Sequence, residues 1–349
     1  MIVAVVGTGL IGGSAGMAAR RRLGAHVRGT GRNGLRAVEL GALDEACLTI
    51  EQAVHGADIA LVCAPVDVLG TVVQEVLALA PSTCAVTDVG STKRDVVAAA
   101  AGDERFVGGH PLAGAEVAGV DHAREDLFDN ATWYLTPQEG TGGVILERVH
   151  RFVSGLGARP HVVAPADHDR MMAAVSHLPH VVANVLVIQA AGALGGERLP
   201  QAGPSFRDAT RVAGANPGIW TGIYRANRDA LLEQLDGAIQ HLEAARELLA
   251  NGDPGRLEDW QAQAGRRHRE LLDASQGGGA SRELRAVVPN RPGVIAQIAL
   301  TLGEAGINIT DMSLTPSPDN TRGSVLLAVP AEHVQRAAAL LGELGIAVA

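Results

Sequence analysis

The first twelve residues limit the possible folds of this chain more than any other segment does. A continuous apolar run, Ile2–Val6, leads into Gly7-Thr8-Gly9-Leu10-Ile11-Gly12, and an Ala-rich segment of helical character follows. In such a strand–turn–helix, Gly7 allows a tight turn, Gly9 lets the backbone approach a pyrophosphate, and Gly12 lets the helix pack closely on the strand. Free N–H groups at the start of the helix attract the anion. The pattern predicts an N-terminal dinucleotide-binding domain, and a glycine-rich turn in an unrelated α/β protein is the alternative.

The remainder of residues 1–164 repeats this alternation of short apolar runs and longer amphipathic segments. Short buried strands that alternate with helices predict βαβ units and a parallel sheet. The later runs are expected at the far side of that sheet. We therefore predict an α/β fold with a Rossmann-type dinucleotide-binding domain over residues 1–164. Its further strands are expected at Ala25–Gly29, Ile59–Cys63, Cys84–Asp88, Phe106–Gly109, Thr132–Leu135 and His161–Val163.

Strand signals disappear between residues 165 and 278. Asp167–Ala193 is a long apolar-periodic stretch interrupted by Pro179, which predicts a kinked or broken buried helix. Asn216–Asn251 and Leu257–Asp273 continue as helical stretches of mixed charge. This block is predicted to be an all-helical domain that pairs two copies of the chain, because its apolar helix exceeds what one small domain can cover.

A third block, residues 283–349, follows the flexible triplet Gly277-Gly278-Gly279. Its pattern is strand, helix, strand, strand, helix and short terminal strand, which is typical of a compact βαββαβ unit of the ferredoxin-like type. The length agrees with this division, since 349 residues at roughly 100–200 per domain suggest two or three domains. The longer elements are expected at Glu283–Val288, Val294–Ala305, Ile307–Leu314, Ser324–Val329 and Ala331–Leu344.

Composition excludes several classes of function. A total of 29 Lys and Arg against 38 Asp and Glu gives a net charge of −9, which argues against general nucleic-acid or anionic-membrane binding. An aromatic content of 3% also excludes a nucleic-acid platform of stacked rings. The three cysteines lack paired or metal-binding spacing, so they are expected to be reduced core residues. No signal peptide is visible before the first strand, and Val181–Leu194 is too short to span a bilayer, so a cytoplasmic protein is predicted.

The end of the second strand discriminates between the two nicotinamide dinucleotides. An acidic residue there binds the ribose 2′-hydroxyl of NAD, whereas a nearby arginine suits the 2′-phosphate of NADP. Here the strand runs into Thr30-Gly31-Arg32, and the first carboxylate after it is Glu39, inside the expected next helix. Thr30 and Arg32 are therefore candidate phosphate ligands, with a solvent-exposed loop arginine as the alternative. The sequence favours NADP and leaves NAD open.

Chemistry is expected from polar groups at the carboxyl ends of the strands, where ligands bind in open α/β sheets. Ser91 follows a strand and precedes a helix, and a helix N-cap is its alternative role. His110 lies between two glycines and a proline, which is unusual for a core histidine. His177 and His180 share one helical face through their spacing of three. They lack a third ligand at usable spacing, so no metal site is predicted.

Taken together, these motifs resemble those of the prephenate/arogenate dehydrogenase family of tyrosine biosynthesis, over residues 1 to about 275 and in the family's order. The third block resembles an ACT domain, an amino-acid-sensing module, through Asn290-Arg291-Pro292-Gly293 and Gly306-Ile307-Asn308-Ile309. Some members of the same enzyme family carry such a module, so the two resemblances support each other. The family motifs are GTGLIGGS near the N-terminus, DVGSTK at 88–93, GGHPLAG at 108–114, SHLPH at 176–180 and FRDATRVAGANPGIW at 206–220.

The family resemblance implies oxidative decarboxylation of prephenate to 4-hydroxyphenylpyruvate, with a hydride passing from ring C4 to the nicotinamide. His110 matches the family's catalytic histidine, a base for the C4 hydroxyl. Ser91 matches the serine that orients the histidine, the hydroxyl and the nicotinamide. Arg211 matches the arginine for the ring carboxylate, to which a bidentate fork is suited. The remaining substrate-binding candidates are His177, a second active-site histidine, Trp220, an aromatic residue near the substrate tail, and Arg207, a neighbour of the arginine site.

The resemblance also implies regulation and assembly. The turn Asn290–Gly293 and the side chain of Asn308 are expected to bind an amino-acid effector, with tyrosine as the feedback inhibitor, and a role in assembly alone is the alternative. Family members pair through the helical domain, so a homodimer is expected. Many NAD-specific members carry an acidic residue where this chain has Gly31, which weakens the expectation of NAD specificity.

Three other functions stay open. Nothing in the sequence separates prephenate from arogenate, which differ only by a keto or an amino group on the side chain. A β-hydroxyacid-type NAD(P) dehydrogenase shares the fingerprint and an all-helical second domain, but such enzymes usually place a lysine base there and residues 167–193 contain none. A non-catalytic amino-acid sensor would use the two binding modules without turnover.

Overall fold

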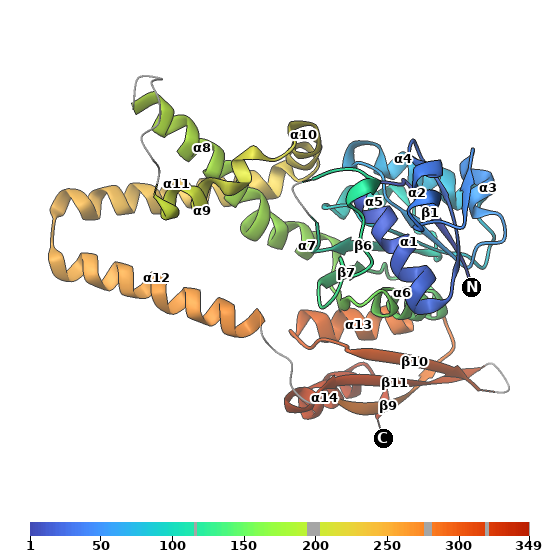
Figure 1. The fold of residues 1–349 in the computed structure, drawn as a ribbon. Coiled ribbons are helices and arrows are strands. Elements are labelled where there is room, and N and C mark those ends of the chain that lie inside the picture. The colour runs from blue at the N-terminus through green and yellow to red at the C-terminus, as the bar shows by residue number, and fades with distance from the viewer. Residues whose placement is uncertain (115–116, 194–202, 276–280, 318–320, 349) are drawn as a thin grey trace.

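The computed structural model describes residues 1–348 except 115–116, 194–202, 276–280 and 318–320. Figure 1 shows an α/β body at the N-terminus, a group of helices to one side of it, and a smaller sheet with its helices packed beneath the body. The fold class predicted from the sequence is confirmed in all three parts. The predicted glycine hinge at 277–279 lies outside the described residues.

The larger sheet has eight strands in the order β3-β2-β1-β4-β5-β6-β7-β8. The order reverses between β1 and β4, and ligands of such sheets bind at the carboxyl ends of the strands beside this switch point. The predicted parallel sheet is confirmed with one exception, since β6 and β7 pair antiparallel. The segment between them contains no α-helix among its described residues, whereas a parallel neighbour needs a crossover connection. The strands are β1 Ile2–Val6, β2 His26–Thr30, β3 Glu45–Cys47, β4 Ile59–Val62, β5 Ala85–Asp88, β6 Phe106–Pro111, β7 Thr132–Thr136 and β8 Arg159–Val162.

The central strands are buried on both faces. Val3 and Val5 of β1 belong to one core cluster, whereas Ala4 and Val6 belong to the other, because successive side chains of a strand point to opposite faces. This burial on both faces explains why the strands read as continuous apolar runs rather than as alternating ones. The first cluster includes residues of α1 Leu10–Leu23, α2 Gly34–Glu39 and α6 Gly143–Gly155, and the second includes residues of α3 Ile50–Val54, α4 Val66–Leu79 and α5 Arg94–Ala99.

The helical part begins with one long interrupted helix. It consists of α7 Pro165–Met172, a π-helical turn Ala173–His177 and α8 Leu178–Ala193. The wide turn lies directly before Pro179, which has no N–H for the ordinary helical hydrogen bond, so the predicted interruption is confirmed. The predicted burial is wrong for α8 in a single chain, because Ala183 is its one buried residue and Ile188 is 72% exposed. The described elements that contact α8 leave Val185 and Ile188 exposed.

The helix from Pro165 to Ala193 is long and apolar enough by length and composition to cross a membrane. The apolar helix is therefore longer than Val181–Leu194, and the prediction that it is too short to span a bilayer is wrong as to its length. That first half buries His168, Asp169 and His177 against the rest of the protein. Because His168 and Asp169 form hydrogen bonds with the α/β body, the helix is an integral part of the fold.

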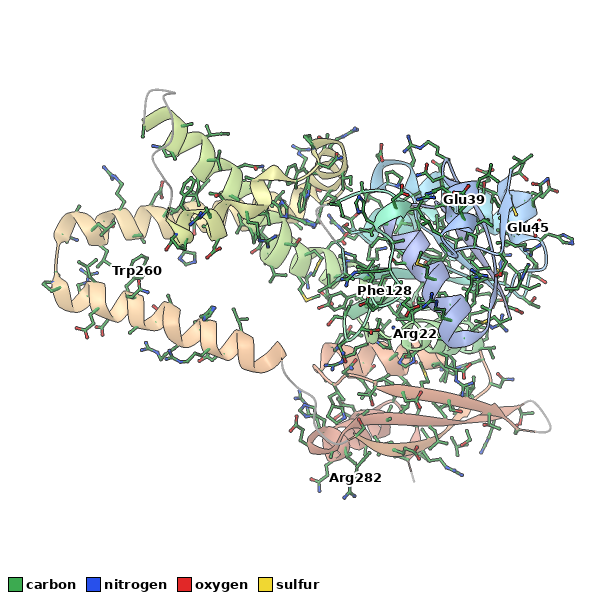
Figure 2. All side chains as sticks on the ribbon, viewed as in Figure 1. Arg22, Glu39, Glu45, Phe128, Trp260 and Arg282 are labelled. Atoms are coloured by element: carbon green, nitrogen blue, oxygen red, sulfur yellow. The ribbon has the colours of Figure 1, made fainter. Side chains whose placement is uncertain are left out.

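The other helices of this part are α9 Pro204–Thr210, a 3₁₀ turn Arg211–Gly214, α10 Pro217–Ala226, α11 Arg228–Asn251 and α12 Pro254–Ser275. The predicted single stretch 216–251 is split at Asn227, which lies between α10 and α11. In Figure 1, α11 and α12 form a hairpin that projects away from both sheets. Trp260 on α12 is 47% exposed (Figure 2), so this hairpin also presents apolar surface.

The C-terminal part contains a four-stranded antiparallel sheet in the order β10-β11-β9-β12. It packs closely on the first domain, because α13 contacts α6 and β8, and a Cβ on Gly303 would overlap the carbonyl oxygen of Val162. Its apolar core is continuous with one of the two clusters of the large sheet. The elements are β9 Ser281–Pro289, α13 Val294–Glu304, β10 Asp311–Pro316, β11 Arg322–Pro330, α14 Val334–Glu343 and β12 Ala347–Val348.

Candidate active site

The turn between β1 and α1 has the geometry of a dinucleotide cradle. A Cβ on Gly7 would overlap the carbonyl oxygen of Cys63, and one on Gly12 would overlap that of Gly7, so both positions require glycine. A Cβ on Gly9 would meet open space, and the first N–H groups of α1, at Leu10 and Ile11, have no side-chain cap among the described residues. Unpaired N–H groups beside open space fit a pyrophosphate.

Thr8 adds a polar atom to this cradle. Its hydroxyl oxygen is buried and has no hydrogen-bond partner within the described chain. A buried hydroxyl without a partner costs free energy, and a bound ligand that pairs with it removes that cost. The residues present therefore fit a nicotinamide dinucleotide.

Position 31, just after β2, has no room for the acidic side chain that is typical of NAD binding. A Cβ on Gly31 would lie 2.6 Å from Thr8 Oγ1 and 2.8 Å from Thr8 N, so no side chain fits there without a backbone shift. Thr30 ends β2 and is partly exposed, and Arg32 is exposed. Glu39 lies in α2, where its carboxylate pairs with Arg36 at 2.9 Å.

His110 lies near the end of β6, opposite Tyr134 of β7, and is partly exposed. Its Nδ1 atom is 2.9 Å from His168 Nε2, and His168 Nδ1 is 2.8 Å from Asp169 Oδ1. Three side chains from β6 and α7 thus form one hydrogen-bonded chain. Burial, followed by the charges of His168 and Lys93, lowers the pKa of His110 well below its ordinary value, so the imidazole is neutral at pH 7.

Asp169 fixes the other end of this chain. Its two carboxylate oxygens accept hydrogen bonds from the backbone N–H groups of Lys93 at 2.7 Å and Arg94 at 2.9 Å, where α5 begins. Burial alone would raise the pKa of the Asp169 carboxyl, but the hydrogen bonds from His168 and from the two backbone amides lower it below its ordinary value. The carboxylate is therefore ionised and held in place.

His177 lies in the π-helical turn and is buried. The side-chain nitrogen of Asn227 is 3.1 Å from His177 Nδ1 and 2.7 Å from the backbone oxygen of Asp169. Burial lowers the pKa of His177 to about 4, because the opposing effect of Asp169 is smaller. His177 also contributes to the lowered pKa of His110, so the two imidazoles lie within electrostatic reach of each other.

Trp220 lies among the other site residues predicted in the helical part. Its ring stacks on His180 with centroids 3.4 Å apart and meets His177 edge-on at 5.9 Å. Burial and the charge of Arg211 lower the pKa of His180, which places Arg211 beside this aromatic cluster. Arg207 lies on α9, one helical turn before Arg211, and both arginines are exposed.

Ser91 lies on the loop after β5 and is partly exposed. It is not a helix N-cap, because α5 begins at Arg94 with Lys93 in the N-cap position. The loop is held by a buried ion pair in which Lys93 Nζ donates to Asp88 and, at 2.6 Å, to the backbone oxygen of Gly109. Lys93 is the single lysine of the chain, and it ties the Ser91 loop to the strand of His110.

The predicted effector turn faces the first domain. The backbone N–H of Gly293 donates to the carbonyl oxygen of Thr141 at 3.2 Å, and a Cβ on Gly293 would overlap the carbonyl oxygen of Glu139. Asn308 carries a buried side-chain oxygen without a partner in the described chain. Within the same residues, no group of three His, Cys, Asp or Glu side chains is arranged to hold a metal ion.

Sequence reasoning missed His168, Asp169, Asn227 and the Asp88–Lys93 pair. His168 and Asp169 look like the polar side of an ordinary amphipathic helix, and Asn227 looks like part of a helical run. Two signals were nevertheless present: ionisable residues inside an otherwise apolar stretch, and a single lysine in 349 residues.

Three family descriptions match consecutive parts of the chain. They are the nucleotide-binding domain of prephenate dehydrogenase over residues 19–162, its dimerization domain over residues 164–263, and the ACT domain over residues 282–346. Prephenate dehydrogenase from Bacillus subtilis is 30% identical over 96% of this chain and 94% of its own length. The chain belongs to the prephenate dehydrogenase family. This confirms the family and the enzyme class, an oxidoreductase, that the motifs predicted.

Solved structures of relatives resemble the chain over 78% of its length, each with a TM-score of 0.70. Arogenate dehydrogenase from Synechocystis is 34% identical and is covered completely, at 100% of that chain. Prephenate dehydrogenase from A. aeolicus, in complex with hydroxyphenyl propionate and NAD⁺, is 27% identical and is covered over 98% of that chain. Cyclohexadienyl dehydrogenase from Zymomonas mobilis is 32% identical over 72% of this chain and 89% of its own length.

Proposed function

We propose that this enzyme catalyses the NAD(P)-dependent oxidative decarboxylation of prephenate to 4-hydroxyphenylpyruvate, a step of tyrosine biosynthesis. The observation that carries the proposal is the electrostatic coupling of His110, at the end of β6, with His177 of the helical part, in a protein that also carries the β1–α1 cradle. Both imidazoles have lowered pKa values and are neutral at pH 7. A neutral base and a neutral hydrogen-bonding group suit a substrate with a ring hydroxyl and an anionic side chain.

A bound nicotinamide supplies the acceptor for the hydride that leaves ring C4. His110 accepts the proton of the C4 hydroxyl while that carbon is oxidised. The bond to the departing CO₂ then breaks, and its electron pair moves through the ring to the oxygen on C4. His110 returns the proton to that oxygen. No separate acid is required, because aromatisation of the ring drives the loss of CO₂. Ser91, on the loop clamped by Lys93, orients the histidine and the hydroxyl.

The substrate carries two carboxylates, and this acidic protein must gather cations where they bind. Arg211 is proposed to bind the ring carboxylate as a bidentate fork, and Arg207 lies one helical turn away from it. His177 and Trp220 are proposed to contact the side chain of the substrate. Their edge-on contact at 5.9 Å supports a common role, because one ligand group can touch both rings.

The proposed cofactor preference is for NADP. The backbone of Gly31 lies against Thr8, which leaves no room there for the carboxylate that binds the NAD ribose. Thr30 and Arg32 are proposed to bind the 2′-phosphate instead. The Arg32→Ala variant is then expected to lose selectivity for NADP over NAD, measured as the ratio of kcat/KM values.

Steady-state kinetics with prephenate and arogenate, each with NAD and NADP, test the proposal directly. Arogenate is the second candidate because the chain is 34% identical to an arogenate dehydrogenase of known structure. The His110→Asn variant is expected to lose about 10²–10⁴-fold in kcat with little change in cofactor affinity, the range for removal of a general base. Absence of turnover with both substrates, or unchanged turnover in His110→Asn, would refute the proposed function.

The proposal includes a homodimer in the cytoplasm and feedback by tyrosine. The exposed apolar residues of α8 supply the surface for the second copy, in the segment that matches the family's dimerization domain. Tyrosine is proposed to bind at Asn290, Arg291, Pro292, Gly293 and Asn308. If saturating tyrosine changes neither the kinetics nor the melting temperature, the regulatory part of the proposal fails.

A further inference from the structure

We infer that His168 and Asp169 are positioning residues for His110, and that they hold its imidazole in the tautomer whose Nε2 is free to accept a proton. The inference rests on the proposed function, since it takes His110 as the base. His168 and Asp169 lie outside the site predicted from the sequence. The inference also says which ring nitrogens of His110 and His168 carry a proton. His110 comes from β6, whereas His168 and Asp169 come from α7. His110 and His168 are 58 residues apart in the sequence.

The direction of each hydrogen bond follows from Asp169. An ionised carboxylate can only accept hydrogen bonds, so the contact at 2.8 Å requires His168 Nδ1 to carry a proton. A neutral His168 then has a lone pair on Nε2. Because His110 Nδ1 lies 2.9 Å from that atom, His110 must donate from Nδ1. The one proton of the neutral His110 ring is thereby placed on Nδ1, and Nε2 keeps its lone pair.

The ionised state of Asp169 rests on its surroundings. Backbone N–H groups of Lys93 and Arg94 donate to its two oxygens, and the Arg94 guanidinium approaches to 3.4 Å. The charged and titratable groups that face the two histidines are Lys93 from the start of α5, His177 from the π-helical turn and Asp88 from the end of β5. Burial lowers the pKa of His168, and its hydrogen bond to Asp169 offsets only part of that effect. Both imidazoles therefore rest in the neutral form.

The arrangement also serves the charged state of His110. When His110 takes a proton, its positive charge lies one imidazole away from a fixed carboxylate. A carboxylate in that position stabilises an imidazolium and keeps its ring oriented, as in the Ser-His-Asp triad. A purely structural role would need only Asp169, whose oxygens pair with the first N–H groups of α5. His168 has no such duty, and its two ring nitrogens are used by His110 and Asp169 alone among the described residues.

Two variants test the relay with prephenate or arogenate, whichever is turned over. Asp169→Asn removes the charge, and His168→Phe keeps the ring but removes both nitrogens. Each is expected to lose about 10–10³-fold in kcat, less than the roughly 10⁴-fold effect of the corresponding triad substitution, because an imidazole intervenes. KM and cofactor affinity should change by less than about threefold. In Asp169→Asn the acid limb of the kcat profile should move to lower pH, because His110 loses the carboxylate that supports its protonated form.

Asp103→Asn is the matched control for this experiment. Asp103 also accepts hydrogen bonds from the backbone N–H and the guanidinium of Arg105, and its pKa is likewise lowered. It precedes the first residue of β6, however, whereas His110 lies near the carboxyl end of that strand. Asp103→Asn is expected to change the stability of the protein but not the pH profile of kcat. If Asp169→Asn behaves like Asp103→Asn, with kcat and the acid limb unchanged, the relay is refuted.

Nitrogen-15 NMR of the histidine rings provides a measurement that does not depend on turnover. In the wild-type enzyme the His110 ring, identified by its loss in His110→Asn, should be protonated at Nδ1. A His110 ring protonated at Nε2 would overturn the inference. The experiment distinguishes the two proposals. Full activity of His110→Asn refutes the proposed function. An inactive His110→Asn beside fully active His168→Phe and Asp169→Asn refutes only the relay.

Discussion

Asn227 donates a hydrogen bond to His177, with its side-chain nitrogen 3.1 Å from His177 Nδ1. The orientation of this amide is fixed, because the same nitrogen also lies 2.7 Å from the backbone oxygen of Asp169, which can only accept. His177 Nδ1 is therefore the acceptor, and the proton of the neutral ring lies on Nε2. His110 and His177 thus hold opposite tautomers, one offering a lone pair and the other an N–H group.

Replacement of Asn227 by leucine removes the donor while keeping a similar volume. His177 is then free to adopt either tautomer, so substrate binding should weaken by about 5–30-fold in KM, with kcat changed less. Steady-state kinetics measure this split. Asn130→Gly is the control, because it removes the hydrogen bond from Arg159 at a remote site and tolerates the φ of +59° found there. A fall in kcat at constant KM would instead assign His177 to the transition state.

Stability should decrease as the pH falls from about 6.5 to about 4. His177 has a pKa of about 4 in the folded protein and an ordinary value of 6.5, so between these values the unfolded chain binds more protons than the folded one. Unfolding is therefore favoured by acid in that window, by about 3 kcal/mol for this residue, and the effect is constant below it. Urea denaturation of the wild type and of His177→Gln at pH 7 and pH 4.5 measures the contribution. The exposed His55→Gln variant should keep the wild-type pH dependence; if His177→Gln keeps it as well, the ring is not held neutral.

The sequence predicted the parts of this molecule that are encoded locally. The fingerprint Gly7–Gly12 needs only its own turn and the adjoining strand and helix, and Pro179 marks its own helix interruption. The direction of β7 was not predictable, because side-chain periodicity does not distinguish parallel from antiparallel pairing. The three-residue β3 is too short to leave a periodic signal.

For the site, sequence motifs identified His110 and His177 but not the groups that orient them. The contacts of His110 with His168 and of Asn227 with His177 join residues 58 and 50 positions apart, so only the tertiary fold brings them together. In the sequence, His168 and Asp169 resemble the solvated side of an amphipathic helix, and their place in an apolar stretch does not show which groups they contact. Burial converts them into a hydrogen-bonded pair, and burial of α8 was itself predicted wrongly for the single chain.

The buried ion pair of Lys93 with Asp88 should dominate the stability of the β5–α5 loop. Both side chains are fully buried, and Asp88 also accepts hydrogen bonds from the backbone N–H groups of Gly90 and Gly109. Lys93→Met leaves a buried carboxylate without its cation, so the free energy of unfolding should fall by about 3–5 kcal/mol. Equilibrium denaturation measures the loss. The exposed pair of Arg170 with Asp167 provides the comparison, because Arg170→Met should cost no more than about 1 kcal/mol. Equal costs for the two variants would show that Lys93 is not held as an ion pair.

Exposed apolar residues on α8 should determine the oligomeric state. Ile188 is 72% exposed and Val185 is 57% exposed, in the segment that matches the dimerization domain. A glutamate at position 188 would place a charge in the proposed interface, so Ile188→Glu should be a monomer by light scattering at micromolar concentration. Leu48→Glu is the control, since Leu48 is 90% exposed on the α/β domain and outside this segment. A wild-type monomer, or a dimer that survives Ile188→Glu, would contradict the proposed interface.

Close packing of the C-terminal domain on the first domain depends on Gly293. This residue has a φ of +86°, and a Cβ on it would overlap the carbonyl oxygen of Glu139, whereas Gly306 has a φ of +74° with open space around the Cβ position. Alanine at either position carries the same backbone strain, of about 1–2 kcal/mol, so their difference isolates the contact between domains. Gly293→Ala should therefore lower the melting temperature more than Gly306→Ala. It should also weaken any response to tyrosine, because the displaced turn is the proposed effector site. Equal effects of the two substitutions would mean that the contact at Glu139 does not hold the domains together.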